Sequence, residues 1–220
     1  MRNLALIWVL AACLLGCGGK TLPSDTDTTF TDKRDGKVYK KIKIGNQIWM
    51  AENLNYAAKK AYVMCYDNDS ANCAKYGRLY MGWEVHNVCP VGWHLPTDEE
   101  WTTLMDYLGD DSMVGTKLKS STGWNSKSGV PAGTDDYGFS ALPGGKGDLS
   151  SYSESGRSFG GAGRRGLWWS ATRYSSQSSY YGAWYREMAY DNEYVYRAQQ
   201  GNWYFLSVRC VLDDEKERRK

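Results

Sequence analysis

Apolar and polar side chains alternate over several short stretches of this chain, which is the pattern of half-buried β-strands. Residues 37–44 alternate, a Gly45-Asn46 turn pair follows, and residues 47–50 resume the alternation. Two alternating runs joined by such a pair predict a β-hairpin. Further strands are expected at 168–171, 183–190, 193–198 and 204–211, with a hairpin turn at Asp191-Asn192. Of Trp168 and Trp169, one is expected to face the core.

One stretch has the spacing of an amphipathic helix that begins after Thr97. Thr97 and Glu100 form a capping-box pattern, and Trp101 opens an apolar stripe at positions i, i+3, i+4 and i+7. Gly109 is expected to end this helix, and a shorter helix is expected over 113–119. The Gly/Ser-rich stretch 123–166 predicts long loops. An early hairpin, one or two helices, long loops and a final meander predict the α+β class.

The first 16 residues have the pattern of a signal peptide. A basic start precedes an apolar run over 4–15, which is shorter than the roughly 20 residues needed to span a bilayer. The run ends in Leu14-Leu15-Gly16-Cys17, which resembles the lipobox of bacterial lipoproteins. That resemblance implies cleavage before Cys17, lipidation of its sulfur and anchoring in a membrane by several acyl chains. Gly18 favours the outer membrane, with the domain periplasmic or surface-exposed. The alternative is an ordinary secretory signal that is cut elsewhere.

Composition divides the rest of the chain into a tether, a domain and a tail. Residues 17–35 are rich in Thr and Asp and poor in apolar side chains, so we expect a lipidated N-terminus and a flexible tether. Residues 36–213 carry the periodic patterns and are expected to form one domain. Residues 214–220 are charged throughout, as in a solvated tail.

The overall composition describes an aromatic-rich, loop-rich globular chain. Its 220 residues include 10 Trp, 17 Tyr and 24 Gly, so neither a disordered chain nor a helical bundle is expected. The 27 basic and 25 acidic residues give a formal net charge of +2. A near-neutral balance with no basic cluster argues against a nucleic-acid partner.

Four cysteines remain after the signal peptide and Cys17: Cys65, Cys73, Cys89 and Cys210. An even number in an exported chain predicts disulfides, and four cysteines allow three pairings. Cys65 and Cys73 flank a polar turn, so we pair them and pair Cys89 with Cys210. Zinc is the alternative, but the chain has no Cys-x2-Cys pair and only two His, so we expect neither a metal nor another cofactor.

Several spaced motifs resemble a known family. They are DGKVY at 35–39, IGNQIWMAENL at 44–54, CPVGWHLPTDEEW at 89–101, DYGFSALPGG at 136–145, WWSAT at 168–172 and SVRCV at 207–211. In this order they resemble the Fibrobacter succinogenes major paralogous domain, a family of exported proteins, many of them lipoproteins, with no settled activity. Two of the motifs are remotely similar to formylglycine-generating enzymes, whose fold is related to C-type lectins. The resemblance implies a C-type-lectin-like α+β domain with long loops, one main helix and antiparallel strands.

Patterns typical of catalytic or ligand-binding motifs occur in the chain, but the neighbouring residues that each motif needs are missing. Gly-x-Ser-x-Gly at 156–160 has no His after it, and Gly-x-Gly-x-x-Gly at 161–166 precedes a strand-like segment where the phosphate-binding motif needs a helix. The Asp67-Asn68-Asp69 start of a calcium loop lacks the glycine that the loop needs, which leaves weak calcium binding as an alternative. We expect His94 to be a hydrogen-bonded core residue and Arg209 to pair with a carboxylate or clamp carbonyls.

These observations favour a non-catalytic binding or structural module that recognises a polysaccharide or a surface protein. Flat aromatic faces suit sugar rings and protein hot spots. The candidate binding residues are Trp124, Asp135, Asp136, Trp184, Tyr185 and Arg186, and for each the alternative is a role in the core. The alternative function is an enzyme with a carboxylate pair, as in glycosidases, although no such pair stands out.

Overall fold

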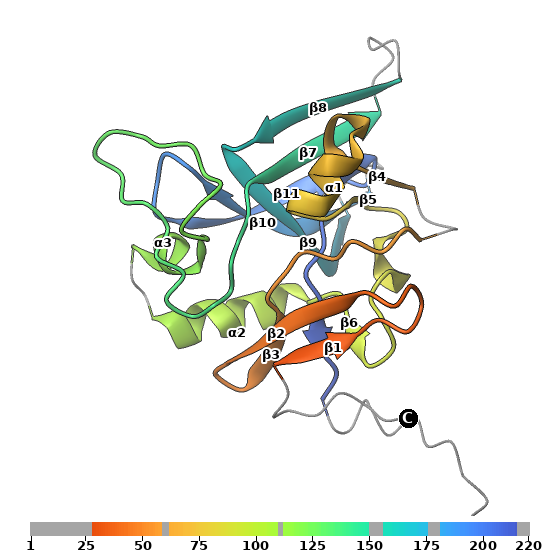
Figure 1. Ribbon diagram of the computed structural model, residues 1–220, viewed down its shortest axis with the longest axis horizontal. Coiled ribbons are helices and arrows are strands. Elements are labelled where there is room, and N and C mark those ends of the chain that lie inside the picture. Colours follow the sequence, from red (N-terminus) through yellow and green to blue (C-terminus); the bar gives the residue numbers. More distant parts are fainter. Residues whose placement is uncertain (1–27, 59–61, 110–111, 150–155, 176–180, 215–220) are drawn as a thin grey trace, which may run out of the picture.

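The computed structural model describes residues 28–58, 62–109, 112–149, 156–175 and 181–214. Most of its regular structure lies in two sheets (Figure 1). The five-stranded sheet consists of β1 (Thr29–Thr31), β2 (Val38–Ile44), β3 (Gln47–Met50), β6 (Trp93–His94) and β13 (Val211–Leu212), in the order β1-β2-β3-β13-β6.

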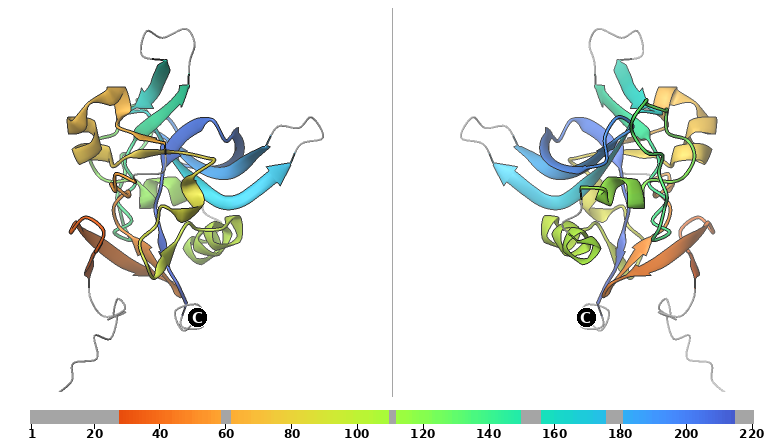
Figure 2. Two further views of the ribbon diagram at one scale, coloured as in Figure 1. Left: turned by 90° about the vertical axis from the view of Figure 1, so that its right-hand side faces the viewer. Right: turned by 90° about the vertical axis from the view of Figure 1, so that its left-hand side faces the viewer.

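The eight-stranded sheet is formed mostly by strands from the second half of the chain. It consists of β4 (Val63–Met64), β5 (Leu79–Met81), β7 (Gly144–Leu149), β8 (Arg157–Ala162), β9 (Arg165–Ser175), β10 (Tyr181–Ala189), β11 (Val195–Gly201) and β12 (Tyr204–Ser207). The strand order is β11-β10-β9-β7-β12-β5-β4, with β8 paired to β7. Figure 2 shows β9 and β10 curving away from the body as a long ribbon.

In the ranges that the structure describes, three α-helices accompany the sheets. They are α1 (Ser70–Tyr76), α2 (Asp98–Leu108) and α3 (Val114–Leu118), and the short 3-10 turns η1 (Tyr66–Asn68) and η2 (Val85–Asn87) complete the elements. The predicted capping box of α2 is confirmed: Glu100 N donates to Thr97 Oγ1 at 3.1 Å, and Thr97 N donates to Glu100 Oε2 at 2.8 Å. The expected helix end at Gly109 is confirmed as well.

The expected α+β, C-type-lectin-like class built around one main helix is wrong, because the chain is mostly β. The helices contain only 7, 11 and 5 residues, whereas the two sheets hold thirteen strands in the described ranges. Two of the strands, β7 (GGKGDL) and β8 (RSFGGA), lie in the stretch 123–166 that was expected to form loops. Glycine has no side chain, so glycine-rich strands do not show the alternation by which strands are recognised.

The predicted tether over 17–35 extends too far. β1 pairs with β2 in antiparallel register, with Phe30 opposite Tyr39, and Phe30 is buried in the core. Asp32 is buried too, and its carboxylate accepts from the guanidinium of Arg34 at 2.7 Å. The fold therefore includes residues from Thr29 onward. The signal peptide, Cys17 and the tail from 215 lie outside the described residues.

Both faces of β9 pack against a core. Trp168 lies in a cluster with Trp49, Trp101 and Phe139, and Trp169 lies in the cluster on the opposite face with Tyr80. The expected core tryptophan is confirmed, and the second ring, which the sequence left unassigned, is fully buried as well. A strand that is covered on both faces has a continuous apolar sequence, so no apolar–polar alternation distinguishes its two faces.

The predicted disulfide pairing is confirmed. Cys65 is joined to Cys73 across η1 and the first turn of α1, and Cys89 is joined to Cys210 across 121 positions of sequence. The second bond ties the loop before β6 to the residue before β13. Within the described residues, no helix has the length and hydropathy of a membrane-crossing segment.

Candidate functional site

One groove lies against the long segment between α3 and β7. It is lined by residues from 119–133 and by Tyr190, which follows β10, and its cavity volume is about 100 Å³. We call it the Trp124 groove. The wall includes two aromatic rings, Trp124 and Tyr190, and the exposed polar side chains of Asn125 and Lys127.

Hydrogen bonds to the neighbouring chain hold this wall in place. Trp124 Nε1 and the Ser120 amide both donate to the carbonyl of Ala141, at 2.9 and 3.0 Å. The amide of Asn125 donates to the carbonyl of Gly163 at 2.7 Å. The wall is therefore fixed before any ligand arrives, which lowers the entropy that binding must overcome.

Lys119 forms the cationic floor of the Trp124 groove. Its Nζ donates to the carbonyls of Ala189 and Asn192, at 3.1 and 2.8 Å, and lies 5.5 Å from the centroid of the Trp124 ring. Burial lowers the pKa of Lys119, although the nearby carboxylates of Glu193 and Asp191 raise it in part. Among the described residues that line the groove, none is acidic.

Two other candidate residues belong to a salt-bridged cluster between α2 and the sheet. Trp184 and Arg186, two positions apart on β10, point to the same face. Arg186 is buried and its guanidinium donates to the carboxylate and carbonyl of Asp98, the first residue of α2. Arg197 of β11 donates to Asp98 Oδ2 at 2.8 Å, and its Cζ lies 3.4 Å from the centroid of the Trp184 ring.

This arrangement, the Asp98 cluster, braces α2 against β10 and β11. Burial raises the pKa of Asp98, but the hydrogen bonds from Arg197 and Arg186 outweigh it and hold the pKa below its ordinary value. Because Arg197 covers one face of the Trp184 ring, that face is not open for a ligand to stack on.

The remaining candidates are spread over two more places. Tyr185 points to the opposite face of β10, where its ring is buried and its hydroxyl donates to Glu187 at 3.3 Å. Asp135 accepts from the backbone amide and the hydroxyl of Ser140, both at 2.6 Å, in a turn where Asp135 has a φ of 55°. Asp136 is exposed in the same turn. The six candidates therefore form no single site in the described residues, and Trp124 is the one that lines the Trp124 groove.

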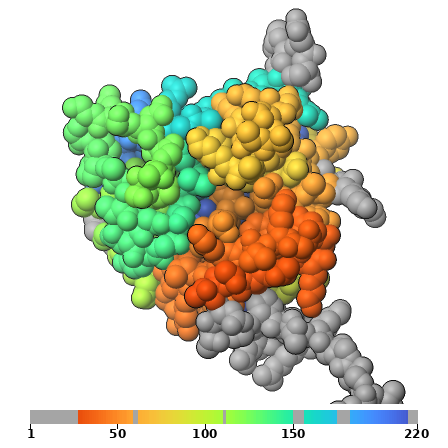
Figure 3. All heavy atoms as spheres, viewed as in Figure 1, coloured from red at the N-terminus to blue at the C-terminus, as the bar shows by residue number. Residues whose placement is uncertain are grey.

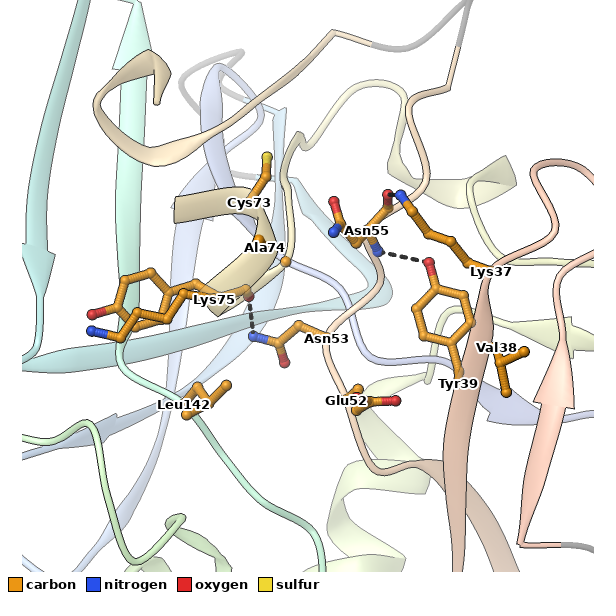
Figure 4. Close-up of a pocket in the computed structure, with 12 residues that line it drawn as sticks. Lys37, Val38, Tyr39, Glu52, Asn53, Asn55, Cys73, Ala74, Lys75 and Leu142 are labelled. Carbon is orange, nitrogen blue, oxygen red and sulfur yellow. Dashed lines mark hydrogen bonds between the residues drawn. The ribbon is translucent and has the colours of Figure 1, made fainter. Parts of the chain in front are cut away.

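A second cavity was missed from the sequence. It lies between the segment 52–55, α1, the start of β2 and Leu142, and its cavity volume is about 180 Å³. We call it the linker pocket. The space-filling view shows a recess where the orange, yellow and green parts of the chain meet (Figure 3). Figure 4 shows Asn53 and Asn55 facing α1, with Lys37 and Tyr39 on the other side of the segment.

Behind the linker pocket lies a fully buried polar centre around Asn53 and Arg209. Asn53 Oδ1 accepts from Trp168 Nε1 and from Arg209 Nη2, both at 2.8 Å. Arg209 also donates to the carbonyls of Phe139 and Ser140, so it clamps carbonyls, the second of the two roles expected for it. Burial lowers the pKa of Arg209 to about 9. The sequence analysis singled out Arg209 of this centre, but it did not single out Asn53.

His94 lies between two carboxylates. Its Nδ1 is 2.7 Å from Asp213 Oδ1, and its Nε2 is 2.7 Å from Glu100 Oε1. Burial alone would lower the pKa of His94, but the hydrogen bonds to Glu100 and Asp213 raise it to about 9. The ring therefore carries a proton on both nitrogens at neutral pH and joins β6, α2 and the residue after β13.

No group of three or more His, Cys, Asp or Glu is placed to hold a metal ion in the part of the chain that the structure describes. In the suspected calcium loop, Asn68 accepts from Arg157 at 3.0 Å, and Asp69 caps α1 by accepting from the amide of Ala71 at 2.9 Å. Two of its three polar side chains are thus bonded within the protein.

Comparison with known proteins gives one match. Residues 42–212 match the model of the family described as the Fibrobacter succinogenes major domain, which confirms the resemblance carried by the motifs. No curated protein and no solved structure matches the chain. The remote likeness to formylglycine-generating enzymes and C-type lectins is therefore not supported by a matched structure.

Proposed function

The chain belongs to the Fibrobacter succinogenes major domain family, and we propose that it is a cell-envelope lipoprotein whose domain binds a polysaccharide in the Trp124 groove without changing it chemically. The observation that carries this proposal is that Trp124 and Tyr190 both line this groove, together with residues that carry amide, hydroxyl and ammonium donors.

The chemistry of the groove supports a glycan ligand. Sugar rings present flat C–H faces that pack on aromatic rings, and their hydroxyls pair with amides and hydroxyls such as those of Asn125 and Ser126. Lys127 adds a positive charge at the surface, and no acidic side chain opposes it on the described wall. These charges favour a polysaccharide that carries acidic groups.

The placement of the titratable groups supports binding without catalysis. Among the described carboxylates and histidines, those with a shifted pKa are His86, His94, Asp98 and Glu100, and none of them lines the Trp124 groove. His94, Asp98 and Glu100 are bound to one another or to arginine, in ion pairs that join elements of the fold. A catalytic acid or base needs to reach the substrate.

The lipobox-like end of the apolar run supports attachment to the outer membrane through Cys17. Only residues 18–28 separate Cys17 from the start of β1, so a fully extended linker reaches about 40 Å at most. The domain would thus stay close to the leaflet that anchors it. We expect Cys17→Ser to move the protein from the membrane fraction to the soluble fraction; a variant still in the membrane fraction would refute the lipid anchor.

Binding is tested with the full chain, purified in detergent, on immobilised acidic and neutral polysaccharides. We expect retention on an acidic polysaccharide, weakened at least tenfold by Trp124→Ala and reduced by Lys127→Ala. Tyr107→Ala removes an exposed aromatic ring of α2, outside the groove, and serves as the matched control. Unchanged retention in both groove variants, or no retention on any polysaccharide, would refute the assignment.

The same experiment separates binding from turnover. The eluted polysaccharide should keep its chain length after long incubation with the protein. Shorter fragments would instead favour the carboxylate-based enzyme, and capture of a surface protein with no glycan binding would favour a protein partner.

A further inference from the structure

The strand β11 lies at one end of the eight-stranded sheet and, within the described residues, pairs only with β10. The two strands keep one register over seven residue pairs, so β11 contains no bulge. No backbone hydrogen bond joins its other edge to another described segment. β11 therefore offers unpaired backbone donors and acceptors along its outer side.

The other edge strands of the described sheets are short or covered. β1, β4 and β6 contain three, two and two residues. β8 contains six, but η1 lies against it: Arg157 donates to Asn68 at 3.0 Å, and the rings of Phe159 and Tyr66 are 5.4 Å apart. With seven residues, β11 is the longest edge strand in the described ranges.

The sequence of β11 lacks the features that usually prevent edge pairing. Soluble proteins commonly protect a long edge with proline, lysine or a bulge. β11 has the sequence VYRAQQG, with neither proline nor lysine. Its one charged side chain, Arg197, lies over the face of the sheet, where it donates to Asp98 and stacks on Trp184. The backbone edge is therefore left open to another strand.

The side chains of β11 are complementary to those of a second, antiparallel copy of β11. Opposite residues of an antiparallel pair point to the same face, so a twofold pairing must place one residue opposite itself. With Ala198 in that position the whole strand pairs, Tyr196 lies opposite Gln200, and Arg197 lies opposite Gln199. A pairing centred on Arg197 would be shorter and would set two like charges opposite each other, which is unfavourable.

Two exposed tyrosines supply apolar area for this pairing. The rings of Tyr194 and Tyr196 are exposed by 51% and 47%, and their centroids are 6.0 Å apart. They lie at the N-terminal end of β11, whereas the smaller Ala198 and Gln200 follow Tyr196 on the same face. Antiparallel pairing places the bulky end of one copy against the smaller end of the other, and it covers rings on both copies.

We propose that β11 pairs with β11 of a second copy of this chain, in an antiparallel register centred on Ala198, and so joins two eight-stranded sheets into one sheet of a twofold dimer. The partner is a second copy because the strand is complementary to itself in length, in the size of its side chains and in charge. No residue of β11 lines the Trp124 groove, so this interface goes beyond the proposed function and does not depend on it.

Cysteine cross-linking of the full chain, with detergent micelles in excess over protein, tests the register. Opposite residues have Cα atoms about 4.5–5.5 Å apart, within reach of a disulfide, whereas the two Tyr196 positions would lie about 13 Å apart along the strands. We expect Ala198→Cys to form a covalent dimer under mild oxidation. Tyr196→Cys should not cross-link to itself, but it should cross-link to Gln200→Cys when the two variants are mixed.

Asn87→Cys, at an exposed asparagine of η2, is the control and gives the background of random cross-linking. Ala198→Cys at this background, or equal cross-linking of Tyr196→Cys to itself and to Gln200→Cys, would overturn the proposal.

Charge variants at the exposed Gln199 test the interface without added cysteines. The dimer contains two symmetric contacts of Arg197 with Gln199, so each substitution acts twice. Gln199→Glu should lower the dissociation constant of the dimer, measured by sedimentation equilibrium, at least threefold, and Gln199→Arg should raise it at least threefold. Trp124→Ala should leave it unchanged, which separates this interface from the groove. A wild type that stays monomeric at millimolar concentration, or equal constants for the two charge variants, would overturn the proposal.

Discussion

At the scale of single residues, buried polar groups decide how the two cores are joined. Asn53 accepts hydrogen bonds from Trp168 and Arg209 with one oxygen atom and donates to Tyr76 with its nitrogen. The sequence identified Arg209 as a clamp or an ion-pair partner but did not show what it binds. Its partners come from positions 53 and 139–140, and contacts over such distances in sequence leave no local pattern.

Asn53→Ala should destabilise the fold strongly. It leaves the indole N–H of Trp168 and part of the Arg209 guanidinium buried without acceptors, which we expect to lower the free energy of unfolding by about 3 kcal/mol or more. Urea unfolding of the full chain measures this change. Asn87→Ala should stay within about 0.5 kcal/mol of the wild type. A loss below about 1 kcal/mol for Asn53→Ala would show that this centre is not important for stability.

At the scale of elements, local signals predicted α2 and the β2–β3 hairpin, whereas non-local pairing decided the rest. A few neighbouring residues determine the capping box and the Gly45-Asn46 turn, and both are present in the structure. β7 and β8 depend on pairing with strands that lie elsewhere in the sequence. β7 pairs with β12 and β9, and β8 pairs with β7. Their glycine-rich sequences alone favour loops, and this is why the expected fold class was wrong.

The contact of His94 with Glu100 and Asp213 makes stability depend on pH. Since the folded pKa of about 9 exceeds the ordinary value of 6.5, the stabilisation is complete below pH 6.5 and is lost as pH rises toward 9. After allowance for the partial exposure of the ring, we expect a loss on the order of 2 kcal/mol between pH 6 and pH 9.

Urea unfolding at several pH values tests this dependence. His94→Gln should be less stable than the wild type at pH 6 and nearly equal to it at pH 9. His86→Gln is a suitable control, because burial and Arg173 lower the pKa of His86, opposite in direction to the shift of His94. An equal pH dependence in wild type and His94→Gln would contradict the contact.

At the scale of the whole molecule, the Cys89–Cys210 disulfide ties the middle of the chain to its last strand. It closes a far longer loop than Cys65–Cys73, with separations of 121 and 8 positions. In the chain-entropy model, Cys89–Cys210 stabilises the fold by about 5 kcal/mol and Cys65–Cys73 by about 2.5 kcal/mol. The sequence was enough to predict both bonds. An even number of cysteines in an exported chain indicated disulfides, and the short polar turn between Cys65 and Cys73 indicated the pairing.

Replacing each cysteine pair with alanine tests this order. Cys89→Ala/Cys210→Ala should lower the unfolding midpoint in urea more than Cys65→Ala/Cys73→Ala does. The two double variants and the wild type are compared under one set of conditions. The reverse order would mean that local strain or residual structure outweighs loop length.

The candidate binding residues show where sequence reasoning stops. An aromatic side chain can be recognised in a sequence, but whether its ring is covered depends on distant residues. Arg197 covers one face of Trp184, the sheet buries Tyr185, and Trp124 lines the Trp124 groove. The linker pocket gave no sequence signal, because its walls come from four separate parts of the chain.

The most direct test of the account is hydrogen exchange of the full chain with and without a saturating polysaccharide that the wild type retains. We predict slower exchange over 119–133 and around Tyr190, and no such protection in Trp124→Ala. Protection confined to other segments, or unchanged exchange over 119–133 while the polysaccharide is bound, would contradict binding in the Trp124 groove.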